Sequence, residues 1–284
     1  MILRLLPIAI AALAVSGARP HGAAFQQAGA SRTALVTLSD ARNRFIVDIG
    51  PDDFVITEGG KAREILDARV ADYPIAVLVD TGRSARPVFA DIRKAVGRFV
   101  NRLGQRPIIV GTLGDPPSIV TSFDDDRGVV AERVEALEAN PAAESMILQA
   151  AANAARKLRE TQSLFTAIVI VSATPVDDSR NAADELVVPI VDAHAIVHAV
   201  VNRVAPTAPI VGLMEVLRRL SQETHGQFTS IYSAASYQAA LDSLADRLAS
   251  EIMVEYLVPV GSAAADAQVG VRLPGARVRG LGVR

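Results

Sequence analysis

Two histidines and three consecutive aspartates have spacings that could hold a metal ion. His194 and His198 share the His-x-x-x-His spacing of zinc peptidases, without the glutamate that follows the first histidine there. They fall in an apolar run that predicts a strand, where four residues span about 13 Å and one zinc ion cannot reach both. Asp124-Asp125-Asp126 could form a cation loop, but its position favours capping the helix expected to follow.

Other catalytic patterns are missing from the 284-residue sequence. It has no Cys, which excludes disulfides, thiol nucleophiles and cysteine zinc sites. The serine-hydrolase, phosphate-loop and dinucleotide-loop patterns are also absent. The formal net charge of -2, with 21% charged residues, excludes a strongly basic nucleic-acid binder and an acidic disordered chain. No catalytic set is therefore expected from these patterns.

Asp80 is the remaining candidate, because it follows the continuous apolar run 75–79. Such a run is typical of a strand buried on both faces of a parallel sheet. A helix is expected next, since apolar residues recur at helical spacing over 88–103, with Pro87 near its start and Gly104 just past its end. Ligands of open α/β sheets bind beyond the carboxyl ends of strands, and Asp80 lies at such an end.

The elements around Asp80 alternate between strands and helices. Further strands are expected at 107–112, 119–123, 167–172, 195–201 and 227–232. Helices are expected at 126–138, 145–160 and 211–225, with a final one from Tyr237 to Ile252. The alternation predicts an α/β fold over residues 73–252, a doubly wound, mainly parallel sheet flanked by helices.

The N-terminal and C-terminal segments have a different residue pattern, with short apolar runs typical of strands. The N-terminal segment 33–72 contains candidate strands at 33–38, 45–49, 54–57 and 65–70. The C-terminal segment 253–284 contains candidates at 254–260, 268–273 and 277–283. We expect both segments to meet in one small β-rich subdomain. Four arginines in the tail are interpreted as a solvated edge that discourages strand aggregation, namely Arg272, Arg277, Arg279 and Arg284.

Residues 1–18 have the features of a secretory signal peptide. Arg4 precedes an apolar stretch over 5–15, which is too short for a transmembrane helix of ~20 residues. Ser16-Gly17-Ala18 favours cleavage after Ala18, and a second possible cut lies after Ala24. Residues 19–32 are expected to be a flexible leader. The protein is thus predicted to be periplasmic or secreted, with no membrane span after cleavage; an uncleaved membrane anchor is the alternative.

The loop Asp80-Thr81-Gly82-Arg83-Ser84 resembles the Asp-x-Ser-x-Ser motif of von Willebrand factor A domains. The helix, His225-Gly226 and strand within 217–232 are similar to the end of many such domains. Two flanking segments resemble a bacterial family of exported von Willebrand factor A-related proteins. They are the short β segment at 52–61, before the domain, and the tail Glu255-Tyr256-Leu257-Val258-Pro259.

The resemblance implies a metal-ion-dependent adhesion site that collects oxygen ligands for Mg²⁺ from three loops, and here it implies a degenerate one. Asp80, Ser84 and Ser145 stand at ligand positions of the family, whereas Gly82 and Ala173 stand where a serine and a second aspartate belong. Ligand charge and number set the affinity for hard cations, so Mg²⁺ binding is expected to be weak or absent. Asp177 or Asp178 is a candidate replacement ligand, with solvated loop acids as the plain alternative.

The letters Asp80-Thr81-Gly82 also match the catalytic loop of aspartic proteases. Those enzymes need two carboxylates that share a proton, and this chain has one such triplet. A protease would therefore have to dimerise. The amphipathic helix after Ser84 also departs from that family, whose loop continues into strands.

The resulting hypothesis is a non-catalytic, exported module that binds an unidentified protein partner. The partner is expected on the loops at 80–86, 140–146 and 173–179. The candidate contact residues are Asp80, Arg83, Ser84, Arg86, Glu144, Ser145, Thr174, Asp177 and Asp178. Two alternatives remain open: an aspartic-type hydrolase acting through Asp80, and a structural protein whose β segments pair with another chain.

Overall fold

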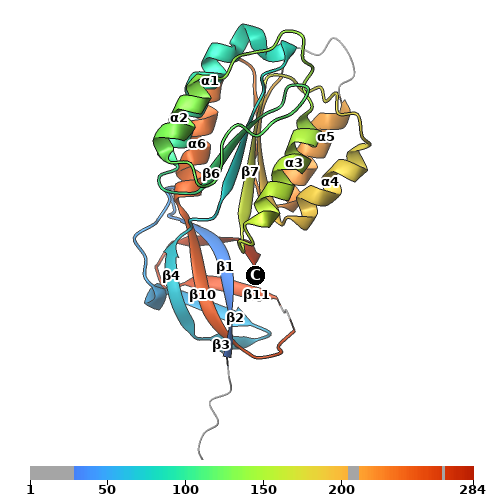
Figure 1. The fold of residues 1–284 in the computed structure, drawn as a ribbon. Helices are drawn as coiled ribbons and strands as arrows, with labels where there is room; N and C mark the ends of the chain where they lie inside the picture. Colours follow the sequence, from blue (N-terminus) through green and yellow to red (C-terminus); the bar gives the residue numbers. More distant parts are fainter. Residues whose placement is uncertain (1–28, 204–210, 264–265) are drawn as a thin grey trace, which may run out of the picture.

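The computed structural model describes residues 29–203, 211–263 and 266–284. The expected signal peptide and the first ten residues of the expected leader lie outside this part of the chain. Figure 1 shows an α/β unit joined end to end to a smaller β-rich unit. Among the described residues, no helix has the length and apolar character needed to cross a membrane.

The α/β unit is built on one five-stranded sheet in which every neighbouring pair is parallel, in the order β6-β5-β7-β8-β9. Its strands are β5 (Ile75–Val79), β6 (Ile108–Thr112), β7 (Thr166–Ser172), β8 (Ala195–Asn202) and β9 (Phe228–Ile231). Helices cover both faces (Figure 1). One face carries α1 (Phe89–Arg102), α2 (Arg127–Glu135) and α6 (Ser236–Ala249); the other carries α3 (Ile147–Glu160), α4 (Ala183–Asp192) and α5 (Val211–Glu223). The predicted doubly wound α/β class is confirmed.

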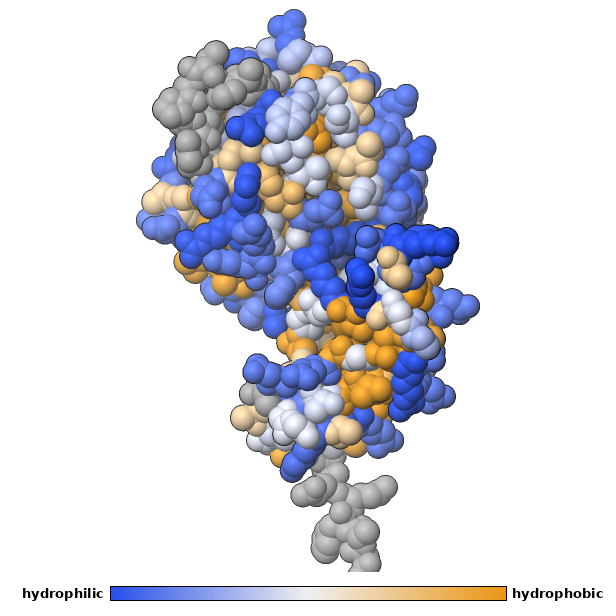
Figure 2. Space-filling model, turned by 180° about the vertical axis from the view of Figure 1, so that it is seen from behind, coloured by the Kyte–Doolittle hydropathy of each residue, from blue (hydrophilic) through white to orange (hydrophobic). Residues whose placement is uncertain are grey.

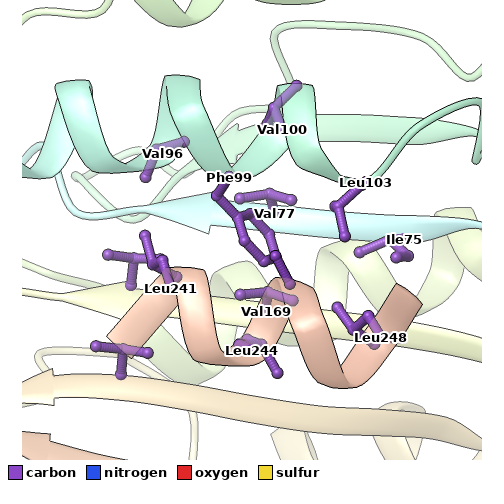
Figure 3. Close-up of a cluster of buried hydrophobic side chains, with 14 of the residues drawn as sticks. Ile75, Val77, Val96, Phe99, Val100, Leu103, Val169, Leu241, Leu244 and Leu248 are labelled. Carbon is purple, nitrogen blue, oxygen red and sulfur yellow. The ribbon is translucent and has the colours of Figure 1, made fainter. Parts of the chain in front are cut away.

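Successive residues of the internal strand β5 point to opposite faces of the sheet and pack in two separate cores. Val77 packs in the cluster under α1 and α6, and Leu78 in the cluster under α3. In Figure 3, Phe99 points from α1 toward α6, with Leu244 of α6 beneath it. The buried side chains here are mostly aliphatic, which is how a chain with 4% aromatic residues fills its core.

The β-rich unit contains strands from the N-terminal and the C-terminal segment, as expected. A four-stranded antiparallel sheet has the order β12-β1-β10-β4, and a three-stranded antiparallel sheet has the order β11-β2-β3. The N-terminal strands are β1 (Gly29–Ser39), β2 (Phe54–Glu58), β3 (Lys61–Arg63) and β4 (Ile65–Val70). The C-terminal strands are β10 (Glu251–Pro259), β11 (Ala267–Val271) and β12 (Arg277–Val283).

Several sequence expectations differ from the structure in the β-rich unit. Strand β1 begins at Gly29, inside the expected leader, because residues 29–37 pair with β10. Residues 45–49 do not form a strand; Phe45 makes only an isolated bridge to Ser39. Ile252 lies in β10 and not in the last helix. It packs in the core of the β-rich unit.

Two differences concern the α/β unit. Residues 119–123 are not a strand, and Ile119 makes one isolated bridge to Gly111. Helix α4 is not expected from the sequence. Pro189 lies inside it, and an apolar residue, Val188, stands on its exposed side, where a helical pattern would have a polar residue. By contrast, the predicted cap is present: the Asp126 carboxylate accepts a hydrogen bond from the Val129 N–H at the start of α2.

Candidate functional site

Three loops meet at the carboxyl edge of the parallel sheet, around Asp80. Asp80 directly follows β5, and Ala173 directly follows the neighbouring strand β7. The third loop leads into α3 and carries Ser145. Its backbone joins the first loop where the Arg83 N–H donates to the Ala143 carbonyl at 2.7 Å. The fold therefore brings together the three loops that the sequence singled out.

The Asp80 carboxylate is fully buried and accepts four hydrogen bonds from the protein. Oδ1 accepts from the Gly82 N–H at 2.9 Å and from the Ser145 hydroxyl at 2.8 Å. Oδ2 accepts from the Ala173 N–H at 2.9 Å and from the Ser172 hydroxyl at 3.1 Å. A carboxylate has about four lone-pair sites, so its acceptor capacity is used by these donors.

Gly82 allows the first loop to approach Ser145 closely. A Cβ atom on Gly82 would lie 2.6 Å from the Ser145 Oγ and 3.2 Å from the Ala143 carbonyl oxygen. The backbone at Gly82 has φ -74°, which any residue can adopt, so the constraint is space alone. A serine at this position, as in the adhesion-site motif, does not fit the present loop.

Tyr237 of α6 supports the end of strand β7, and sequence reasoning did not identify it as a site residue. Its hydroxyl donates to the Ser172 carbonyl at 2.8 Å. Burial, together with the negative charge of Asp80, raises the pKa of Tyr237 above its ordinary value, so the hydroxyl stays a donor. Tyr237 opens the periodic apolar face of α6, and that face was the one sequence signal for its burial.

The exposed side of the first loop carries three of the predicted contact residues. Arg83 forms an ion pair with Glu144 of the third loop at 2.6 Å, and both side chains are largely exposed. Ser84 and Arg86 are exposed, and among the described residues neither side chain has a hydrogen-bond partner. Ser84 therefore does not join Ser145 at the Asp80 carboxylate.

The loop after β7 caps helix α3. Asp177 Oδ1 accepts from the Ile147 N–H at 2.7 Å and from the Ser179 hydroxyl at 2.7 Å. This is the position of an anion at the positive end of a helix. The Thr174 side chain is buried, whereas Asp178 is exposed and donates its N–H to the Ser145 carbonyl at 2.9 Å. Neither aspartate is hydrogen-bonded to Asp80.

The donor set around Asp80 does not fit a hard divalent cation. Such an ion takes several oxygen ligands with free lone pairs, and carboxylates are preferred among them. Here Asp80 already accepts two N–H and two hydroxyl groups, and an alanine stands at the second carboxylate position. In the described ranges, no group of three His, Asp or Glu side chains is arranged to hold a metal ion.

The two histidines lie apart from this site. His198 is fully buried in β8, and its Nδ1 accepts the Gln227 N–H at 3.1 Å. Burial first, and then the charges of Arg247, Arg106 and Arg279, lower its pKa to about 3. His194 precedes β8 with a positive φ of 51°. His198 is thus a neutral core side chain.

Comparison with solved structures identifies the fold. A von Willebrand factor type A structure from Catenulispora acidiphila aligns with a TM-score of 0.50 and 12% identity, covering 92% of this chain and 74% of that one. Proximal thread matrix protein 1 from the mussel byssus, in a form with a zinc-occupied MIDAS motif, aligns with a TM-score of 0.51 and 10% identity, covering 71% of this chain and 50% of that one. The chain thus spans about half the length of the mussel protein.

No protein-family model and no curated protein matches the sequence. The solved structures are distant in sequence, so their likeness concerns the fold alone. It confirms that this chain has the von Willebrand factor A fold, as the sequence resemblance implied.

Proposed function

We propose that this chain, with its von Willebrand factor A fold, is an exported, non-catalytic module that binds a protein partner without a metal ion. The observation that carries the proposal is the buried Asp80 carboxylate, whose two oxygens each accept two hydrogen bonds. These bonds join three loops at the sheet edge where ligands of α/β folds bind. A metal-dependent adhesion site presents a cation with an open coordination position to a carboxylate of its partner. The four hydrogen bonds to Asp80 support a surface that works without such a cation.

The partner would contact the outer side chains of the three loops. Arg86 and Asp178 are exposed and make no ion pair in the described part of the chain, so they are free to meet charges of a partner. The exposed Arg83–Glu144 ion pair belongs to the same surface and links two of the loops. Loops held on a rigid sheet are the usual place for such contacts.

Charge reversal tests the proposed surface. The variant Arg86→Glu/Asp178→Arg changes two exposed side chains without removing a hydrogen bond of the fold. The matched control is Glu132→Arg/Arg133→Glu, which reverses two exposed charges on α2. Each protein is used for affinity capture from a periplasmic or secreted extract of the source organism. We expect the loop variant to lose a partner that the wild type and the control recover; equal recovery by all three would contradict the proposal.

Export is a separate part of the proposal and rests on the sequence of residues 1–18. N-terminal sequencing of the protein isolated from its native extract tests it. Cleavage after Ala18 gives a mature chain that starts at Arg19. Recovery of the uncut chain in the membrane fraction would support the anchor alternative instead.

A second candidate, β-pairing with another chain, is favoured by the surface of the β-rich unit. Strand β4 is an edge strand, and its residues Leu66 and Val70 are 45% and 50% exposed. Figure 2 shows a hydrophobic area on this unit, seen from behind. Exposed edges with apolar side chains are templates for another strand. Partner loss in Leu66→Lys/Val70→Lys, with capture unchanged in the loop variant, would favour this candidate.

A further inference from the structure

A cavity, unrelated to the Asp80 loops, lies where the two units meet. It has a volume of about 420 Å³ and is open to solvent. One wall is formed by β1 and β12 of the β-rich unit, and the opposite wall by α6 and Gln227, the residue before β9. In Figure 2, hydrophilic residues gather at this junction, above the hydrophobic area of the β-rich unit.

The strand register sets the chemistry of the first wall. In the antiparallel pair of β1 and β12, Ser39 lies opposite Arg277 and Thr37 lies opposite Arg279. Alternate residues of a strand share a face, so two guanidinium groups and two hydroxyl groups line the same side of the sheet. All four residues line the cavity.

The second wall adds a further cation. Ser243 and Arg247 are four residues apart on α6, which places both on the same side of the helix. Arg247 is 9% exposed. Its guanidinium donates to the His225 and Gly226 carbonyls at 2.6 and 3.5 Å. Those neutral acceptors hold the side chain in place without cancelling its charge.

No aspartate or glutamate lines this cavity. The carboxylates nearest to it in the sequence are already engaged. Asp40 pairs with Arg44 at 2.7 Å, Asp242 pairs with Arg98 and Arg102 at 2.9 Å each, and Asp246 pairs with Arg102. Within the described ranges, Arg277 and Arg279 form no ion pair, and after burial the charge of Arg279 is the next cause that lowers the pKa of Arg247. Three like charges thus share a hollow whose lining holds no carboxylate; the negative charge of Glu251, which does not line the cavity, acts on Arg247 in the opposite direction.

The other two arginines of the tail, Arg272 and Arg284, do not line the cavity and make contacts elsewhere. Arg272 donates a hydrogen bond to the Asp52 carbonyl. The Arg284 guanidinium lies 6.0 Å from the centre of the Phe165 ring. All four arginines are exposed, as expected for a solvated edge, and Arg277 and Arg279 in addition line the cavity.

We propose that this junction cavity binds a doubly charged oxyanion, the phosphate group of a small soluble molecule. Guanidinium forks match the tetrahedral oxygens of phosphate, and the hydroxyl groups of Thr37 and Ser39 add neutral donors. Phe45 also lines the cavity and offers an apolar contact for the organic part of the ligand. The volume lies in the range of small-molecule sites, about 300–1,000 Å³. A ligand here would touch both units of the protein.

Isothermal titration calorimetry of the full chain with inorganic phosphate tests the site. The test variant is Arg277→Gln/Arg279→Gln. The matched control is Arg133→Gln/Arg156→Gln, which removes two exposed charges away from the cavity. Glycerol 3-phosphate is titrated in parallel. Phosphatidylcholine vesicles with and without phosphatidic acid serve as the lipid probe, and sodium acetate controls for ionic strength.

We expect saturable binding of phosphate and of glycerol 3-phosphate by the wild type and the control. The test variant should bind both at least tenfold more weakly, while circular dichroism shows that it remains folded. Three results would overturn the proposal: no saturable binding of either anion, an equal loss in the test and control variants, or binding to phosphatidic acid vesicles alone.

Discussion

The buried Ser145 hydroxyl donates a hydrogen bond to Oδ1 of Asp80 at 2.8 Å, at the carboxyl edge of the parallel sheet. In the family motif, an aspartate and a hydroxyl at these positions are both cation ligands. Here each is bonded to the other, and both are buried. The pair therefore joins two loops at the position where the resemblance implied a degenerate metal site.

Replacement of Asp80 by asparagine should destabilise the protein by about 2–4 kcal/mol, because an amide group would face two donors and leave them without an acceptor. The free energy of unfolding is measured by urea denaturation. Asp178→Asn is the control, since that side chain is exposed and should change the stability by less than about 0.5 kcal/mol. Similar stabilities of the two variants would show that the four hydrogen bonds at Asp80 matter little.

Gly82→Ala should cost about 1–3 kcal/mol, because the new methyl group would lie 2.6 Å from the Ser145 Oγ. In a Ser145→Ala background this contact is removed, and the cost of Gly82→Ala should fall. The double-mutant cycle is measured by thermal and urea unfolding. Gly97→Ala in α1 is the control: its nearest neighbour atom would be 3.9 Å away, and replacing a helical glycine should stabilise the protein. Additive effects of the two site changes would contradict the steric interpretation.

Local patterns in the sequence predicted most of the fold. The apolar run 75–79 and the alternating run 277–283 correspond to β5 and β12 residue for residue. Both are local patterns: a continuous apolar run for a strand buried on both faces, and an alternating run for a strand with one exposed face. Helix α4 escaped prediction because its Pro189 and its exposed Val188 break the amphipathic pattern.

The site was predictable only in part, because its decisive contacts join distant segments. The motif pointed to Asp80 and Ser145, and the exchange at Ala173 raised doubt about a metal. Ser172 and Tyr237 were missed as site residues, since no local pattern tells that the Ser172 hydroxyl bonds Asp80 or that Tyr237 reaches the Ser172 carbonyl. The junction cavity likewise depends on the register between β1 and β12.

Magnesium should neither bind saturably in the micromolar range nor raise the melting temperature of the wild type. The physical reason is that the Asp80 oxygens would have to give up protein donors before they could coordinate an ion. Calorimetric titration and thermal shift with Mg²⁺, compared with a chelator-treated sample, provide the measurement. Micromolar binding that disappears in Asp80→Ala would refute the metal-free interpretation.

His198 should make the protein less stable in mild acid. Its pKa in the folded state is lowered to about 3 from the ordinary 6.5. Between these values the unfolded chain binds a proton that the folded chain does not, so the free energy of unfolding falls as the pH falls, by about 1.4 kcal/mol per unit. Between about pH 7.5 and about pH 5 the loss should reach about 2 kcal/mol.

The variant His198→Asn isolates this contribution, because asparagine does not titrate and can still accept the Gln227 hydrogen bond. Burial raises the pKa of Glu251, which acts in the opposite direction, but Glu251 is present in both proteins and cancels in the comparison. Urea unfolding at the two pH values should therefore show a wild type that loses about 2 kcal/mol more than the variant on acidification. Parallel pH profiles would contradict this prediction and would mean that His198 is protonated inside the fold in spite of burial and the surrounding arginines.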